Sequence, residues 1–197
     1  MAKIFLDLGS HNGQSLVKAI EQFPDCDHFY AVEPVKFLLN KSVKRIKKLG
    51  IKKKVTFLNC AMDVLHGKKE TDMVFYEDVF RQNHKLGSSL LPTKNMRKKE
   101  EVKVHCLDIN AFLEERFTTD DEVMLKLDIE GKEYDILESL IKTGNLKKYV
   151  TNLWVEWHWK KASELSKERH TKLIHKLNKL GYPLTGNSRK DEFYHGL

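Results

Sequence analysis

The stretch IFLDLGSHNG, from Ile4 to Gly13, is an apolar run that contains one acid and ends in two glycines separated by three residues. A helical pattern follows from about Ser15 to Gln22. This order predicts a buried strand, a tight turn and a helix. Because the first N–H groups of a helix have no partner inside it, such a turn offers donors to a ligand at the carboxyl edge of a sheet. The stretch therefore predicts the first unit of a ligand-binding α/β fold.

The alternation of strands and helices continues along the chain. Strand-like runs occur at HFYAVEP (28–34), VTFLNCAM (55–62), EVMLKLDIEG (122–131) and VTNLWVEWHW (150–159), with helical patterns between them. This rhythm is typical of a parallel sheet with helices on both faces. A long polar loop at about 77–101 separates two further strand-like runs, TDMVFYED and VKVHCLD. We interpret residues 1–197 as one domain.

The last part of the chain predicts a helix and then a hairpin. Ser163 is the expected helix cap, and Gly181 follows the last helical residue. YPLT and EFYHGL, separated by the turn-rich GNSRKD, are typical of a C-terminal antiparallel hairpin.

The composition indicates a globular protein with anionic partners. Hydrophobic residues make up 41% of the 197, and the formal net charge is +7. We expect no signal peptide, no membrane insertion and a cytoplasmic location, because no apolar run approaches the roughly 18 residues of a membrane span. The three cysteines are far apart, which favours reduced thiols. The basic run NKSVKRIKKLGIKKKV makes nucleic acid a candidate partner, although the same lysines fit the solvated face of an amphipathic helix.

Two acids beside the glycine turn indicate which ligand it holds. Asp7 lies two residues before Gly9 and would repel a pyrophosphate, but it can accept hydrogen bonds from a ligand's amino group, directly or through water. Glu33 ends the next strand, 20 residues after Gly13, where a carboxylate takes both hydroxyls of a ribose. Together these positions describe S-adenosylmethionine better than NAD. A tight strand-to-helix turn without a ligand is the alternative.

The next strand end, LNCAMD, is expected beside the base of the ligand, where it can supply an apolar wall and an acceptor for the adenine amino group. Asp63 can equally cap a turn there. The predicted cofactor-binding residues are Asp7, Gly9, Ser10, His11, Asn12, Gly13, Glu33, Pro34, Ala61, Met62, Asp63 and Asp128.

With KLDIEGKEYDIL, Lys126 to Leu137, the chain resembles the FkbM-like family of S-adenosylmethionine-dependent methyltransferases. DLGSHNG, VEP and this motif occur in the order of that family, and the resemblance extends from about Ile4 to Trp157. It implies a Rossmann-like class I methyltransferase fold with a mainly parallel seven-stranded sheet, helices on both faces and a C-terminal antiparallel hairpin. It also implies S-adenosylmethionine as methyl donor and a hydroxyl of a sugar or natural product as acceptor.

Candidate catalytic residues follow two strands at the same edge of the sheet. Asp128 and Glu130 are expected on one side of their strand, with Glu133 one turn into the next helix. These acids can orient a hydroxyl or hold a divalent ion through oxygen, although no metal ligands are assigned. The alternative is that Asp128 or Glu130 caps the helix near Gly131 and Glu133 stabilises its first turn.

WVEWHWK supplies the second pair, Glu156 and His158, on one face of a strand end. His158 is a candidate general base, and tryptophans beside a carboxylate suit a sugar ring. A buried strand with packed tryptophans explains the aromatic residues equally well. The candidate catalytic residues are Asp128, Glu130, Glu156 and His158.

The sequence leaves three functions open. An O-methyltransferase acting on a small hydroxylated molecule, a saccharide above all, is the leading hypothesis. The loop residues His84, Ser88 and Ser89 are candidates to close over that acceptor, with a surface loop as the alternative. The rivals are a nucleic-acid methyltransferase, favoured by the basic run, and a non-catalytic cofactor-binding module.

Overall fold

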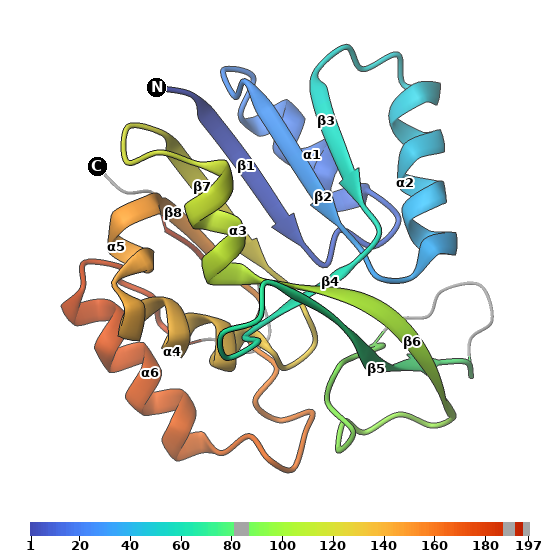
Figure 1. Cartoon of the computed structure of the whole chain (residues 1–197), viewed down its shortest axis with the longest axis vertical. Coiled ribbons are helices and arrows are strands. Elements are labelled where there is room, and N and C mark those ends of the chain that lie inside the picture. The colour runs from blue at the N-terminus through green and yellow to red at the C-terminus, as the bar shows by residue number, and fades with distance from the viewer. Residues whose placement is uncertain (81–86, 187–191, 195–197) are drawn as a thin grey trace.

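The computed structural model describes residues 1–80, 87–186 and 192–194. Its main sheet has six strands in the order β3-β2-β1-β7-β8-β9 (Figure 1). The first five are parallel, and β9 pairs with β8 in the antiparallel direction. The strands are β1 (Lys3–Leu8), β2 (His28–Val32), β3 (Lys54–Leu58), β7 (Glu122–Leu127), β8 (Val150–Val155) and β9 (Glu192–Tyr194). The parallel α/β fold predicted from the alternating pattern is confirmed.

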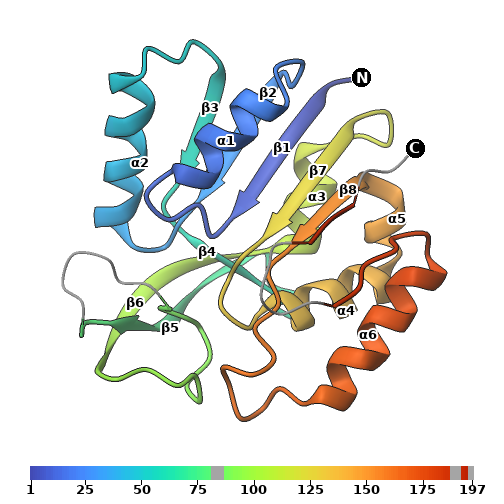
Figure 2. The ribbon, with the colours of Figure 1, turned by 180° about the vertical axis from the view of Figure 1, so that it is seen from behind.

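Six helices cover the two faces of this sheet in the described part of the chain. They are α1 (Gln14–Gln22), α2 (Lys36–Lys48), α3 (Ile109–Arg116), α4 (Glu133–Thr143), α5 (Asn145–Tyr149) and α6 (Lys167–Lys179). Figure 2 shows α1 over the face opposite to α3. None of these helices is long and apolar enough to cross a membrane.

The continuous apolar run of β1 follows from its burial on both faces. Leu6 and Leu8 contribute to the core beneath α3, α4 and α6, whereas Phe5 packs with the buried residues of α1 on the other face. The three cysteines are free and buried, and burial raises the pKa of each thiol to about 12. Burial therefore favours the protonated thiols at neutral pH, which are poor nucleophiles.

A second sheet, in the order β4-β6-β5, lies beyond the carboxyl ends of β1 and β2 (Figure 1). Its strands are β4 (Ala61–Asp63), β5 (Glu70–Asp78) and β6 (Lys99–Asp108). The run VTFLNCAM is therefore two strands in two sheets, and the expectation of one seven-stranded sheet is corrected. The break occurs at Asn59, whose side-chain amide donates to the carbonyl oxygens of Glu33 and Pro34 at 3.0 and 2.9 Å.

The C-terminal hairpin also differs from the prediction. Residues 182–185 adopt no strand, because Tyr182 packs in the core and donates its hydroxyl proton to the carbonyl oxygen of Val150 at 2.7 Å. Most of the turn GNSRKD lies outside the described residues, and β9 adds to β8 instead of to YPLT. The last helix begins after Ser166, whose hydroxyl accepts from the Arg169 N–H, so Ser163 is not its cap.

Helix α2 is amphipathic, as predicted from its basic run. Leu38 and Ile46 are buried, and its lysines lie toward solvent. Phe37 is 46% exposed, with the Lys41 ammonium 4.3 Å from the centre of its ring. Arg45 is not a purely solvated charge, because its Nε donates to the carbonyl oxygen of Asn12 at 3.1 Å.

Both glycines of the first turn are required by close approach. Gly9 has a φ of +81°, and a Cβ there would lie 1.9 Å from the carbonyl oxygen of Asp128. Gly13 has the same φ, and a Cβ there would lie 2.3 Å from the Ser42 hydroxyl oxygen in α2. The first turn is thus pressed against the end of β7 on one side and against α2 on the other.

We expect Gly9→Ala to lower the free energy of unfolding by about 2–5 kcal/mol, because the new Cβ collides with rigid backbone in addition to being strained at positive φ. Gly144→Ala is the matched control: its φ is +83°, and nothing lies within 4 Å of its Cβ position. The control should lose only the backbone strain, about 1–2 kcal/mol. Urea denaturation of both variants measures the difference, and equal losses would contradict the proposed contact with Asp128.

Candidate functional site

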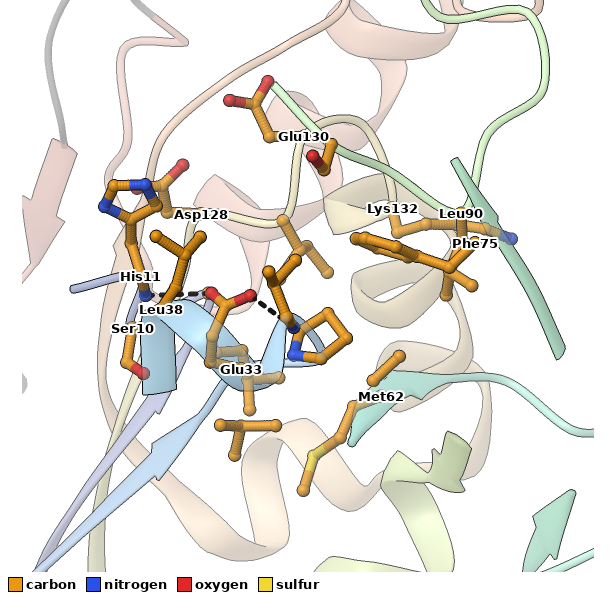
Figure 3. Close-up of a pocket in the computed structure, with 18 of the residues that line it drawn as sticks. Ser10, His11, Glu33, Leu38, Met62, Phe75, Leu90, Asp128, Glu130 and Lys132 are labelled. Atoms are coloured by element: carbon orange, nitrogen blue, oxygen red, sulfur yellow. Dashed lines mark hydrogen bonds between the residues drawn. The ribbon is translucent and has the colours of Figure 1, made fainter. Parts of the chain in front are cut away.

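A cavity of about 260 Å³ opens where β1, β2 and β7 end (Figure 3). The carboxyl edge of a parallel sheet is the usual place for a ligand, since helices begin there and turns leave N–H groups free. The cavity is lined by the first turn, the end of β2, the start of β4 and the residues that follow β7. Predicted site residues that line it are Gly9, Ser10, His11, Asn12, Glu33, Pro34, Ala61, Met62, Ser88, Asp128 and Glu130.

Glu33 is the buried acid of this cavity, with 5% of its surface exposed. Its Oε2 accepts from the backbone N–H of His11 at 3.0 Å, and its Oε1 accepts from that of Val35 at 2.8 Å. Each oxygen keeps a further lone pair for a ligand, because an ionised carboxylate has about four acceptor positions. Burial raises the pKa of Glu33 to about 7, against the lowering effect of the two backbone hydrogen bonds.

The first turn holds its backbone against Glu33. His11 has a backbone φ of +50°, a value that residues other than glycine rarely adopt. This conformation directs its N–H to the Glu33 carboxylate. Gly13 precedes α1 with no side-chain hydrogen bond capping the helix. Such unusual backbone persists where the surrounding structure enforces it, and it is common in ligand sites.

The end of the cavity beneath β4 is apolar. Ala61 and Met62 line it as predicted, together with Leu38, Cys60 and Phe75. Asp63 is buried but does not line the cavity, because its Oδ2 contacts the Lys132 ammonium at 2.7 Å. Its predicted contact with a base stays a prediction.

Asp7 also lies behind the cavity wall. It is fully buried, with Oδ1 at 3.0 Å from the Lys126 ammonium and Oδ2 accepting from the Ser15 hydroxyl at 2.8 Å. Lys126 sits directly opposite Asp7 in the register of β1 and β7 and also contacts Asp128 at 3.4 Å. Sequence reasoning missed Lys126 as a partner, although a lysine inside an otherwise apolar strand was a signal that an acid must accompany it.

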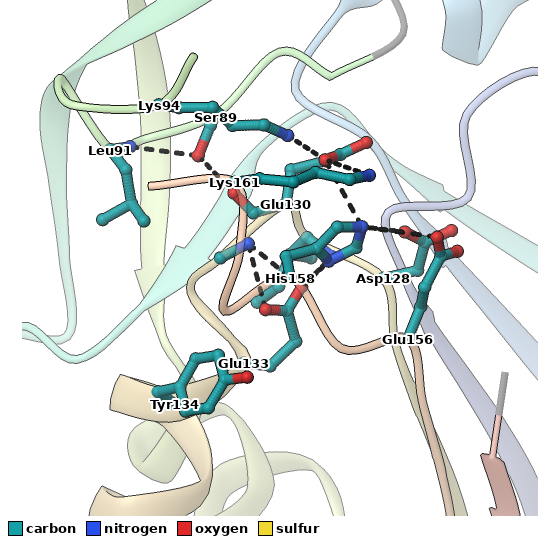
Figure 4. A network of polar contacts seen from close by, with 12 residues as sticks. Ser89, Leu91, Lys94, Asp128, Glu130, Glu133, Tyr134, Glu156, His158 and Lys161 are labelled. Atoms are coloured by element: carbon teal, nitrogen blue, oxygen red, sulfur yellow. Dashed lines mark hydrogen bonds and ion pairs between the residues drawn. The ribbon is translucent and has the colours of Figure 1, made fainter. Parts of the chain in front are cut away.

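The candidate catalytic residues meet beside the cavity, which Asp128 and Glu130 line and which Glu156 and His158 do not (Figure 4). The Nε2 of the buried His158 lies 3.4 Å from an oxygen of Glu130, 3.4 Å from one of Glu156 and 3.9 Å from one of Asp128. The structure therefore brings together all four residues predicted from two separate motifs. Their strands end earlier than expected, at Leu127 and Val155, so turns and not strand alternation aim these side chains.

Glu133 holds His158 in place within this cluster. It is fully buried, and its carboxylate accepts from the N–H groups of Ile129 and Gly131 at 2.9–3.1 Å and contacts His158 Nδ1 at 2.8 Å. Neither Asp128 nor Glu130 caps α4, because Lys132 is the residue at its N-cap. Glu133 itself lies in the first turn of α4, but its carboxylate bonds the N–H groups of the loop before the helix, so the alternative that it stabilises that turn stays a prediction.

The surrounding charges shift the pKa values of this cluster in different directions. Burial alone lowers the pKa of His158, but Glu133 and Glu156 overcome it and raise that pKa to about 9. The interaction with His158, whose Nε2 lies 3.4 Å from its carboxylate, lowers the pKa of Glu156 to about 2. Burial raises the pKa of Asp128, against the opposing effect of Lys126. With this raised pKa, His158 is an imidazolium at neutral pH and carries a proton on both ring nitrogens.

Two lysines that sequence reasoning also missed approach Glu130. The ammonium of the buried Lys94 contacts its carboxylate, and that of Lys161 lies 3.5 Å away. Burial, together with the positive charge of Lys161, lowers the pKa of Lys94 to about 7. Lys94 comes from the long loop, so its distance in sequence from Glu130 concealed the contact.

The loop residues have defined places. Ser88 lines the cavity, and its hydroxyl oxygen accepts from the Asp78 N–H at 2.9 Å. Ser89 is buried and donates to the carbonyl oxygen of Glu130 at 2.9 Å. His84 lies outside the described residues.

The tryptophans do not line the cavity in the described part of the chain. Trp157 is buried and packs on Tyr134, with 5.6 Å between the ring centres, and Trp159 stacks on His170 at 5.7 Å. The alternative of packed aromatic residues is therefore correct for these side chains. Phe75 is the aromatic ring that the described cavity contains.

Comparison with known proteins identifies one family. The family model described as Methyltransferase FkbM domain matches residues 7–184. The fold is similar to the crystal structure of Methyltransferase FkbM from Methylobacillus flagellatus KT, with a TM-score of 0.55 and 13% identity over 98% of this chain and 43% of that one. The N-terminal domain of human METTL16 in complex with SAH gives a TM-score of 0.44 and 14% identity, over 98% and 60% of the two chains. Functionally curated sequences give no significant match.

Replacing Lys126 tests whether its buried ion pair with Asp7 stabilises the protein. Lys126→Met leaves a fully buried carboxylate without its cation, so we expect a loss of about 3–5 kcal/mol in the free energy of unfolding. The double variant Asp7→Asn/Lys126→Met should recover most of that loss, because position 7 no longer carries a buried charge. Lys172→Met, which breaks an exposed pair with Glu168, is the control and should leave stability unchanged. Additive losses in the double variant, measured by urea denaturation, would contradict the pairing.

Proposed function

The chain belongs to the FkbM methyltransferase family, since the family model matches most of its length, and from this premise we propose that it transfers a methyl group from S-adenosylmethionine to a hydroxyl of a saccharide or a similar small metabolite. Glu33 is the observation that carries the cofactor assignment. It is a buried acid beside a glycine turn, with lone pairs available to two ribose hydroxyls. The chain spans 43% of the Methylobacillus protein, so the substrate is inferred from its own residues.

The lining of the cavity fits the parts of this cofactor. Ser10, His11 and Asn12 line the cavity where we expect its amino acid end, and Ala61 and Met62 supply apolar surface for its adenine. Asp7, expected to accept from the amino group directly or through water, does not line the cavity and holds Lys126 behind its wall. When bound, the cofactor supplies a methyl group on a positively charged sulfur, which leaves the protein to align the acceptor and exclude water.

Asp128 is the residue best placed to take the proton of the acceptor hydroxyl. It lines the cavity between the first turn and the Glu130 cluster, and burial raises its pKa toward that of a useful base. His158, as an imidazolium, stabilises the surrounding carboxylates instead of accepting a proton. Ser88 and Glu130 provide polar groups at this end, and Phe75 and Leu90 provide apolar surface, a combination that suits a sugar.

One feature favours a nucleic-acid acceptor instead. Helix α2 borders the cavity through Val35 and Leu38, and the exposed side chains of Lys44, Lys47 and Lys48 can attract phosphates. A methyl-transfer assay that includes RNA distinguishes the two acceptors.

Cofactor binding should depend on pH through Glu33. The carboxylate accepts ribose hydroxyls only when ionised, so the affinity for S-adenosylhomocysteine should rise as the pH increases through about 7. Glu33→Gln should bind about 10–100-fold more weakly at pH 8, which corresponds to losing charged hydrogen bonds of 1.5–3 kcal/mol, and should show a flatter profile. Calorimetry from pH 5.5 to 8.5 measures both effects, with the exposed Glu21→Gln as control. Undiminished binding by Glu33→Gln, or tight binding of NAD, would overturn the cofactor assignment.

The acceptor is tested by turnover of labelled S-adenosylmethionine against sugars, glycolipids, small hydroxylated metabolites and RNA. We expect label in a hydroxylated small molecule, and a reduction by Asp128→Asn of about 10²–10⁴-fold in turnover with S-adenosylhomocysteine binding retained. Transfer to RNA alone would overturn the saccharide proposal. Full turnover by Asp128→Asn would remove this residue from the proton transfer.

A further inference from the structure

The Nε2 atom of His158 is a buried nitrogen that points into a group of acids. The side chain is fully buried, and Nε2 has no hydrogen-bond partner in the described residues. The oxygens around it belong to Glu130, Glu156 and Asp128, which come from two different strand ends (Figure 4). A buried polar atom without a hydrogen bond costs free energy, so such an arrangement calls for a further group between nitrogen and oxygens.

The distances indicate what that group is. A charged N–H···O hydrogen bond is about 2.7–2.9 Å long, whereas Nε2 lies 3.4 Å from Glu156 and 3.9 Å from Asp128. Two ligand atoms that each lie about 2.0–2.2 Å from a shared metal ion are roughly 3.0–3.5 Å apart. One ligand atom each from Asp128, Glu156 and His158 lies within 4.8 Å of the other two. The cluster therefore needs only a small contraction to surround an ion.

The other nitrogen of the ring is already held for this purpose. Nδ1 lies 2.8 Å from the buried carboxylate of Glu133, which backbone N–H groups of Ile129 and Gly131 hold in place. A carboxylate behind a histidine orients the ring and increases the basicity of the opposite nitrogen, as it does at metal centres. Glu133 thus directs Nε2 toward Asp128 and Glu156.

Charge separates Glu130 from Asp128 and Glu156. Asp128 shares the Lys126 ammonium, 3.4 Å away, with Asp7. Glu130 is neutralised by Lys94 and Lys161, so it is left out of the ligand set. The ion-pair partner of Glu156 in the described residues is His158 alone. The side chain of Glu156 is 36% exposed and that of Asp128 29%, which gives an ion access from solvent.

We propose that Asp128, Glu156 and His158 form a binding site for one divalent transition-metal ion, with Mn²⁺ as the matching chemistry for one imidazole and two carboxylates. Binding displaces a proton from Nε2 into solvent, since only the neutral ring coordinates a metal. The remaining positions stay open to water or to an acceptor hydroxyl, whose pKa the ion would lower. This role in the reaction rests on the proposed methyl transfer, whereas the ion-binding site itself does not.

Metal binding is measured on the full chain after treatment with EDTA, in the absence of cofactor and acceptor. Titration with Mn²⁺, followed by electron paramagnetic resonance, should show one bound ion per chain and a nitrogen ligand. Glu156→Gln, His158→Gln and Glu133→Gln should each weaken binding by at least about tenfold, and the nitrogen signal should disappear in His158→Gln. Glu100→Gln and His175→Gln change exposed residues of the same types and should bind as the unmodified protein does.

Absence of binding for Mn²⁺, Zn²⁺ and Mg²⁺ would overturn the site, and so would affinity unchanged by Glu156→Gln. Because Glu156 is partly exposed, its isosteric variant tests the site even where a change of the buried His158 prevents folding. S-adenosylhomocysteine binding is measured in parallel. Lost metal binding with cofactor binding retained contradicts only the metal site, whereas metal binding without cofactor binding contradicts only the proposed function.

Discussion

The close contact between the first turn and the end of β7 is the constraint on which the site depends. Gly9 lies against the carbonyl oxygen of Asp128, where no Cβ fits. Backbone hydrogen bonds tie the same region together: Gly9 and Ser10 donate to the Val32 carbonyl oxygen, and Asp128 donates to that of Leu8. Three strand ends are thereby held side by side, so Glu33 and Asp128 line the same cavity. A wider turn would separate Glu33 from Asp128.

Charge is compensated in different ways at Glu33 and around His158. Glu33 accepts hydrogen bonds from two backbone N–H groups, and burial raises its pKa to about 7. Around His158, four acids and three lysines lie close together, so ionised forms persist in spite of burial, as the pKa of about 2 for Glu156 illustrates. Neutral donors and full charges thus compensate burial differently at two neighbouring places in the structure.

The second sheet and the long loop complete the wall of the cavity. Asn59 ends β3 by binding the backbone after Glu33, which directs β4 away from the main sheet and leaves Ala61 and Met62 on the cavity wall. The Ser89 hydroxyl donates a hydrogen bond to the carbonyl oxygen of Glu130, which connects the loop to the residues after β7. The loop therefore contributes to the wall through specific hydrogen bonds, as well as through its buried Leu90.

The amino-acid sequence by itself determined the parallel α/β fold, the glycine turn, the placement of Glu33 and the two motifs that meet at His158, because apolar periodicity and turn chemistry are local properties. Only the tertiary structure decided which charges pair. Three buried ion pairs depend on strand order and register between distant segments: Asp7–Lys126, Asp63–Lys132 and Glu133–His158. The split of VTFLNCAM and the burial of Tyr182 in place of a hairpin have the same origin, since both follow from contacts with residues far away in the chain.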